Sequence, residues 1–231
     1  MTIPSIKRKA AYPGILHEND LIPFNANIPY ANLVSKHSNI IQRIDNINIK
    51  IKLAYESYKN NITDKPPFQL ANLTEHCFII EEIIYWLRKT ADELISIMYV
   101  CKYFDKNQTH PSKVKLEKID DLLKNKNSEL SIIFTAYLSS LENLNSISNA
   151  YKHSFVNSQL NIIGEFEPIV PALSLLHNNT NNTNNPIKFY SIELAKIIND
   201  FSDFYVFTDN YLRTKFSSFS NKEDNKTQEP I

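Results

Sequence analysis

Apolar residues recur with helical spacing over four long stretches of this chain. The clearest stretch covers about residues 70–103, where apolar side chains repeat at alternating spacings of four and three and therefore share one helix face. Similar stripes predict long helices over about 31–58, 128–157 and 191–216. Because each apolar face needs neighbouring helices to bury it, the pattern predicts an all-α fold, most economically a four-helix bundle.

Capping residues and apolar spacing predict where the later helices begin and end. Ser128 followed by Glu129 suits the start of the third long helix, and Ser191 with Glu193 suits the start of the last. A short helix is expected over about 115–124. We therefore expect one bundle domain over residues 31–216, preceded by an irregular arm over 1–30 and followed by a disordered tail over 217–231.

One segment inside this domain has no helical period. Residues 164–190 contain Pro168 and Pro171 among apolar residues, followed by an asparagine-rich tract over 178–185. Asparagine favours turns, and proline confines a strand to the edge of a sheet. The segment is therefore predicted to form a small β-hairpin or an extended flap.

The composition excludes several classes of protein. Only two glycines occur, Gly14 and Gly164, so that no phosphate-binding glycine loop or dinucleotide fingerprint is present. The formal net charge is zero, which counts against a basic surface for DNA. The histidines lack metal-site spacing, and no cofactor motif occurs. Because we find no signal peptide, no apolar run of about 20 residues and only two cysteines, we expect a cytoplasmic protein without a membrane contact.

Polar residues interrupt the apolar pattern of the second helix. Glu81, Tyr85, Arg88 and Asp92 follow one another at spacings of four, three and four, and therefore share a face beside the apolar seam. Partly buried charges need partners, and Arg88 can pair with Asp92. The stripe is either a structural ion pair that fixes the helix register or a held cation that meets an anionic ligand.

A second polar stripe lies on the third helix. Asn145, Asn149 and His153 share a face, with Ser148 and Lys152 beside it. Asparagine is unfavourable inside a helix unless it is hydrogen-bonded, so the stripe indicates a polar pocket. His153 is the candidate for proton transfer and Lys152 for binding a phosphate. The alternative is a buried histidine that Asn149 and a neighbouring helix satisfy.

The segment from Leu144 to Phe155 resembles the terminal motif of the HEPN family. Asn149 and His153 match the motif asparagine and histidine, whereas Ser148 stands where catalytic members carry arginine. The Arg88–Asp92 segment is similar to a helix of uncharacterised bacterial HEPN-like proteins, and the resemblance spans about residues 70–216. It implies a four-helix bundle that acts as a metal-independent endoribonuclease of bacterial defence or toxin type, with its site at a homodimer interface.

Together these observations give a hypothetical site. Its catalytic residues are His153, Asn149 and Arg88, and its substrate-binding residues are Lys152, Asp92, Asn145 and Tyr85. Arg88 replaces the missing arginine, or the protein binds RNA or a nucleotide without cleaving it. The expected partners are a second copy, RNA or a nucleotide, and a cognate antitoxin or defence protein. Two further hypotheses stay open: a non-catalytic dimerising interaction module, and a small-ligand site beneath the flap.

Overall fold

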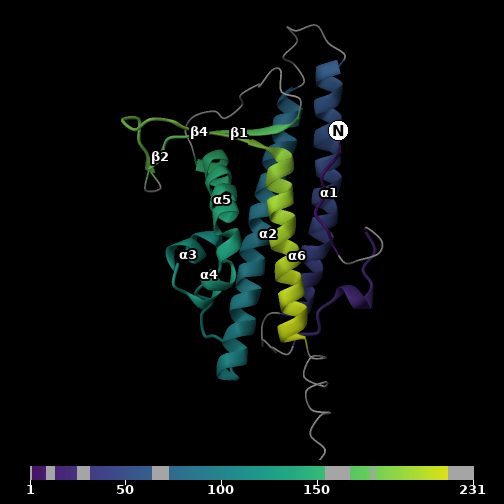
Figure 1. Cartoon of the computed structure of the whole chain (residues 1–231), viewed down its shortest axis with the longest axis vertical. Coiled ribbons are helices and arrows are strands. Elements are labelled where there is room, and N and C mark those ends of the chain that lie inside the picture. Colours follow the sequence, from purple (N-terminus) through teal and green to yellow (C-terminus); the bar gives the residue numbers. More distant parts are fainter. Residues whose placement is uncertain are drawn as a thin grey trace, which may run out of the picture. The chain divides into compact units, whose positions relative to one another are not determined.

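The described part of the chain is mostly helical, with two small antiparallel sheets (Figure 1). The computed structural model describes residues 2–8, 14–24, 32–63, 73–153, 167–177 and 180–217. The helices over these residues are η1 (Glu18–Asp20), α1 (Leu33–Thr63), α2 (Leu73–Asn107), α3 (Ile119–Lys124), α4 (Glu129–Ile133), η2 (Thr135–Tyr137), α5 (Leu138–His153) and α6 (Leu194–Phe216). The strands are β1 (Ile169–Ser174), β2 (Leu176–His177), β3 (Thr180–Asn181) and β4 (Lys188–Glu193). The two sheets pair β1 with β4 and β2 with β3.

The apolar stripes correctly predicted the three longest helices, α1, α2 and α6. In α2, the predicted face is buried from Ile80 to Cys101, while Cys77 is half-buried. Burying such a face stabilises a long helix more than the intrinsic preferences of its residues do. None of the helices in the described part of the chain combines the length and the apolarity that a membrane span requires.

The prediction of one continuous third helix was wrong. Ser128 caps α4 as expected, because its side chain accepts a hydrogen bond from the Ser131 amide at 3.1 Å. The helix then ends at Ile133, and the 3₁₀ turn η2 separates it from α5. The Thr135 hydroxyl donates to the carbonyls of Ser131 and Ile132, and such local side-chain bonds compete with the regular helical ladder. The predicted end of this helix, residues 154–157, lies outside the described residues.

The prediction of a hairpin between the last two long helices is confirmed. Strands β1 and β4 lie side by side (Figure 1) and pair antiparallel. Pro171 of β1 lies opposite Ser191 of β4. The predicted cap at Ser191 was wrong, because both Ser191 and Glu193 belong to β4 and α6 begins only at Leu194. Pairing with β1 therefore holds these residues extended, and the Leu194 amide donates to the Pro168 carbonyl at 2.9 Å.

The N-terminal arm packs through only some of its apolar residues. Ile22 is buried, whereas Ile15 is 55% exposed. Ile6 is also buried, and its backbone amide and carbonyl both bond to the Asn48 side chain, at 2.8 Å and 3.1 Å. The polar side chain of Asn48 on α1 therefore has a structural partner in the arm. Ser217, the first residue of the predicted tail, is buried and bridges to Phe24, while 218–231 lie outside the described residues.

The chain divides into two compact units, to each of which α1, α2 and α6 contribute residues. The first consists of Met1–Ile6, Asn46–Lys89 and Tyr137–Ser202, and the second of Lys7–Asp45, Thr90–Ala136 and Asp203–Ile231. Buried side chains of the first unit include Ile51, Ile80, Ile84, Leu87, Ile147, Val170 and Ile198. Those of the second include Ile40, Ile44, Leu94, Met98, Leu122, Phe134 and Phe204. Each unit therefore has a core of its own.

Candidate functional site

Two antiparallel helix segments of the first unit bring most of the predicted site residues together. The Arg88 Nε on α2 donates to the Asn145 Oδ1 on α5 at 3.0 Å. Nearer the start of α2, the Lys152 ammonium of α5 lies 4.6 Å from the centre of the Tyr85 ring. Because the earlier residue of α2 meets the later residue of α5, the two segments run antiparallel. Arg88 and Tyr85 of the polar stripe on α2 thus contact Asn145 and Lys152 on α5.

A cavity of about 330 Å³ lies between these segments. Its lining residues are Phe78, Glu81, Glu82, Tyr85, Ser148, Tyr151 and Lys152. The Tyr85 ring packs edge-to-face against Trp86, with 4.9 Å between ring centres, and this contact helps to fix its orientation. An ammonium within about 6 Å of an aromatic face is attracted to it, so Lys152 also interacts favourably with Tyr85. The cavity thus combines aromatic faces, carboxylates and a cation.

Ser148, which replaces the motif arginine, is buried beside this cavity. The side chain is 1% exposed, and its hydroxyl has no hydrogen-bond partner among the described residues. Leaving a buried polar group unpaired costs about 1–3 kcal/mol, so most such groups in proteins are satisfied. A hydroxyl both donates and accepts, and that of Ser148 is therefore suited to a polar ligand group in the cavity.

The two carboxylates of the cavity have different surroundings. Glu82 pairs with Lys50 of α1, with 2.8 Å between Nζ and Oε2. Glu81 is exposed and forms no ion pair within the described part of the chain. Burial is the largest cause that raises the pKa of Tyr151, and the nearby Cys77 and Glu81 raise it further. The Tyr151 hydroxyl donates to the Pro171 carbonyl at 2.9 Å. Glu81 is consequently the cavity carboxylate that is available to a ligand.

His153 lies apart from the Arg88–Asn145 pair. It is exposed at the end of α5, and its backbone carbonyl accepts from the Asn181 side chain of β3 at 2.8 Å. His153 follows Asn145 by eight residues, which corresponds to a rise of about 12 Å along the helix. The Arg88 guanidinium therefore lies beside Asn145, about two helical turns along α5 from His153 of the same protomer. Asn149 is half-buried between the two levels.

Asp92 has a structural contact in the second unit. Its Oδ1 accepts a hydrogen bond from the backbone amide of Ile119, at 2.9 Å. Ile119 begins α3, and the preceding residue, Lys118, provides no side-chain cap. Asp92 thus satisfies one of the free amides at this helix start, where a carboxylate is also favoured by the helix dipole. The predicted pairing of Asp92 with Arg88 stays a prediction.

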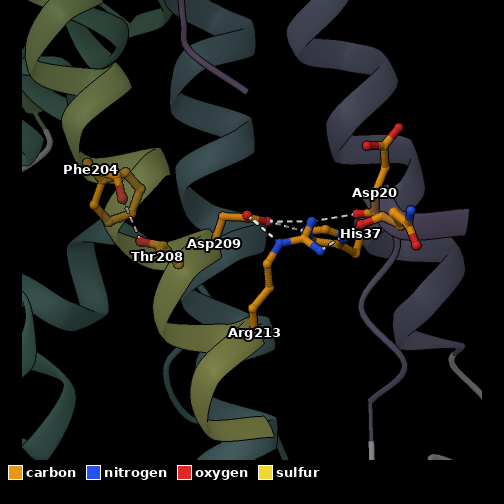
Figure 2. A network of polar contacts seen from close by, with 7 residues as sticks. Asp20, His37, Phe204, Thr208, Asp209 and Arg213 are labelled. Atoms are coloured by element: carbon orange, nitrogen blue, oxygen red, sulfur yellow. Dashed lines mark hydrogen bonds and ion pairs between the residues drawn. The ribbon is translucent and has the colours of Figure 1, made fainter. Parts of the chain in front are cut away.

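Sequence reasoning missed a buried polar network in the second unit. His37 Nε2 lies 3.0 Å from Asp209 Oδ1, and Arg213 Nε lies 2.7 Å from Asp209 Oδ2 (Figure 2). Arg213 also donates to the backbone carbonyls of Asn19 and Asp20, which ties the N-terminal arm to α6. His37 is fully buried, and its Nδ1 has no hydrogen-bond partner among the described residues.

This network holds the Asp209 carboxylate in its charged form. Burial alone would raise the pKa of Asp209, but the hydrogen bonds from His37 and Arg213 outweigh burial and lower it. One sequence signal pointed to this residue. The apolar seam of α6 passes from Tyr205 to Leu212, and Asp209 takes the seam position between them. Asp209 thus joins α6 to His37 of α1 and orients Arg213, which binds the N-terminal arm, and this arrangement is typical of a structural role.

The comparisons supply no relative for this site. No protein-family model, no curated protein and no solved structure matches the chain. In the described part of the chain, no group of three or more histidine, cysteine, aspartate or glutamate side chains is arranged to hold a metal ion. The α2–α5 cavity and its lining residues are therefore the feature of the molecule that bears on function.

Proposed function

We propose that this chain is a HEPN-like helical protein that binds RNA or a nucleotide in the α2–α5 cavity. The observation that carries the proposal is the Lys152 ammonium beside the Tyr85 ring at the edge of that cavity. Proteins bind unpaired bases by stacking them on aromatic rings and hold the phosphates with cationic side chains. Tyr85 would stack a base, and Lys152 would move from the ring to the phosphate.

The proposal is one of binding rather than of cleavage within a single protomer. Metal-independent cleavage of RNA needs a cation that stabilises the phosphate while a histidine transfers the proton. Arg88 is engaged by Asn145 about 12 Å along α5 from His153, and Ser148 cannot replace an arginine. Endoribonuclease activity would therefore require a cation from a second copy, as in the dimeric site that the HEPN resemblance implies.

A second candidate function is a non-catalytic dimerising module, and two polar contacts support it. Asn145 accepts from Arg88, and Asp92 accepts from the Ile119 amide, so that both of these stripe residues serve the fold. Exposed rings at Phe78 and Tyr85 would then contact a second copy or a defence partner. Under this alternative the cavity residues contribute to association and have no affinity for nucleotides.

The proposal is tested by fluorescence anisotropy with a labelled single-stranded RNA. We expect Tyr85→Ala to weaken binding about 5- to 150-fold, because stacking one base contributes about 1–3 kcal/mol. Lys152→Ala should weaken binding and reduce its dependence on salt. Lys196→Ala is the matched control, since Lys196 is exposed on α6 and pairs with Asp200. Equal affinity of Tyr85→Ala and wild type would exclude the proposal.

Two further measurements separate the alternatives. Light scattering over a range of protein concentrations reports dimer formation, and a dimer without RNA affinity would favour the interaction module. Incubating the RNA with wild type and with His153→Ala in the presence of a metal chelator tests cleavage. Cleavage by wild type alone would show that His153 acts in a dimeric site despite Ser148.

A further inference from the structure

We infer that the α2–α5 cavity selects guanine over the other bases, with Glu81 as the residue that determines this specificity. The inference rests on the proposed nucleotide binding and goes beyond it by naming the base. Glu81 lies between two exposed rings of α2, three residues after Phe78 and four before Tyr85. These spacings place all three side chains on one helix face. A base stacked on either ring therefore has its edge directed toward this carboxylate.

The chemistry of a carboxylate favours one base edge. An ionised carboxylate only accepts hydrogen bonds, and its two oxygens can accept two parallel ones. Guanine presents two adjacent donors, N1–H and the N2 amino group. Adenine and cytosine place a ring-nitrogen acceptor beside their amino group, and uracil places its one N–H between two carbonyls. Each of these other bases would turn an acceptor toward Glu81, which is repulsive.

The surroundings of the cavity support this assignment. Glu82 is engaged by Lys50, whereas Glu81 has no ion pair among the described residues, so its oxygens are accessible. The guanine edge continues from its two donors to the carbonyl O6, which accepts. The buried Ser148 hydroxyl, unpartnered within the described residues, is a donor in the same cavity. Glu81 and Ser148 thus offer the two acceptors and the donor that the guanine edge requires.

Size and charge limit the ligand to about one nucleotide. The cavity volume of about 330 Å³ lies near the lower end of the ~300–1,000 Å³ that small-molecule sites occupy. Lys152 provides a positive charge at the cavity, which suits a single phosphate group. The ligand class is therefore guanosine monophosphate or a guanosine nucleotide within a single-stranded RNA.

The test is isothermal titration calorimetry of the full chain with the monophosphates of guanosine, inosine, adenosine, cytidine and uridine. We expect the guanosine nucleotide to bind about 5- to 150-fold more tightly than the last three, which corresponds to the ~1–3 kcal/mol of one bidentate base contact. Inosine lacks the N2 amino group and should fall between them. Glu81→Gln should remove the preference for guanosine, because an amide replaces one of the two acceptor oxygens.

Glu75→Gln provides the matched control, because Glu75 is exposed on the same helix and does not line the cavity. It should retain the preference of the wild type. Equal binding of all the nucleotides would overturn the inference while leaving nucleotide binding in place. A guanosine preference that persists in Glu81→Gln would likewise overturn the role of Glu81. Absence of binding by any nucleotide or RNA would remove the proposed function together with the inference.

Discussion

Replacing Asp209 with alanine should destabilise the protein by about 3–5 kcal/mol, the usual cost of breaking a buried charge pair from one side. The Asp209 side chain is 6% exposed and accepts from His37 at 3.0 Å and from Arg213 at 2.7 Å. Its removal leaves the fully buried His37 ring without its hydrogen-bond partner. Arg213 keeps its bonds to the backbone carbonyls of Asn19 and Asp20, which places the expected cost toward the lower end of this range.

The free energy of unfolding is measured by urea denaturation, followed by far-ultraviolet circular dichroism. Asp203→Ala is the matched control, because Asp203 is exposed on the same helix and its loss should cost less than about 0.5 kcal/mol. A double-mutant cycle with Arg213→Ala should reveal a coupling of at least about 1 kcal/mol, since these residues touch. A cost below about 1 kcal/mol for Asp209→Ala, or additive effects in the cycle, would refute this account of the network.

The contribution of Asp209 also depends on pH. Its folded pKa lies below the unfolded value of 3.8, so its stabilising contribution is complete above that value. As the pH falls below 3.8 and through the folded pKa, the carboxylate becomes protonated in the folded state too and the contribution is lost. The difference in stability between wild type and Asp209→Ala should therefore narrow on acidification below about pH 4. A constant difference over this range would show that charge is unimportant at this position.

Three further predictions follow from burial. Burial lowers the pKa of His76 from 6.5, so the unfolded chain binds a proton at a higher pH than the folded chain does, and stability should fall as the pH drops below 6.5. The His76→Phe variant keeps a ring against Tyr58 and cannot titrate, so its melting temperature should depend less on pH than that of the wild type. Leu94→Ala should cost about 2–5 kcal/mol in urea denaturation, against less than about 0.5 kcal/mol for the exposed Ile49→Ala. Burial raises the pKa of Cys101 to about 12, so its thiol should react with a chromogenic disulfide reagent near neutral pH only after denaturation.

Local periodicity was enough to predict the three longest helices, α1, α2 and α6. In α2 the alternating spacing continues over the whole helix, and its predicted positions from Ile80 onward are buried. Because every turn of such a helix places an apolar residue on the same face, a single polar position does not obscure the pattern. Periodicity carries no information about the partner of His37, because Asp209 lies 172 residues away in the chain.

The incorrect boundaries have non-local or competing causes. Ser191 and Glu193 form a reasonable helix start by themselves, but pairing with β1 extends β4 through both residues. In the third helix, the Ser128 cap was predicted correctly, whereas the interruption near Thr135 was missed because a single threonine is common within helices. Boundaries depend on such competition between local hydrogen bonds and on partners that are distant in sequence.

Only part of the candidate site could be predicted from the sequence, because two of the seven predicted residues line the cavity. Tyr85 and Lys152 were both chosen from helical spacing, and the structure brings them to one cavity. The spacing could not show the register of α2 against α5, which determines that Arg88 meets Asn145 rather than a residue near His153. Register between two helices is a property of their packing, and a single sequence carries little information about it.

The hairpin of β1 and β4 bears on how the protein behaves at high concentration. A two-stranded sheet has two outer edges, and unpaired edges invite the addition of a strand from another molecule. In β1, Pro171 has no amide to donate, and its carbonyl already accepts from Tyr151. In β4, Phe189 is 55% exposed, and the charges that discourage stacking of chains lie only at the two ends of the strand, on Lys188 and Glu193. Intermolecular strand pairing, and with it any tendency to aggregate, should therefore begin at β4 rather than at β1.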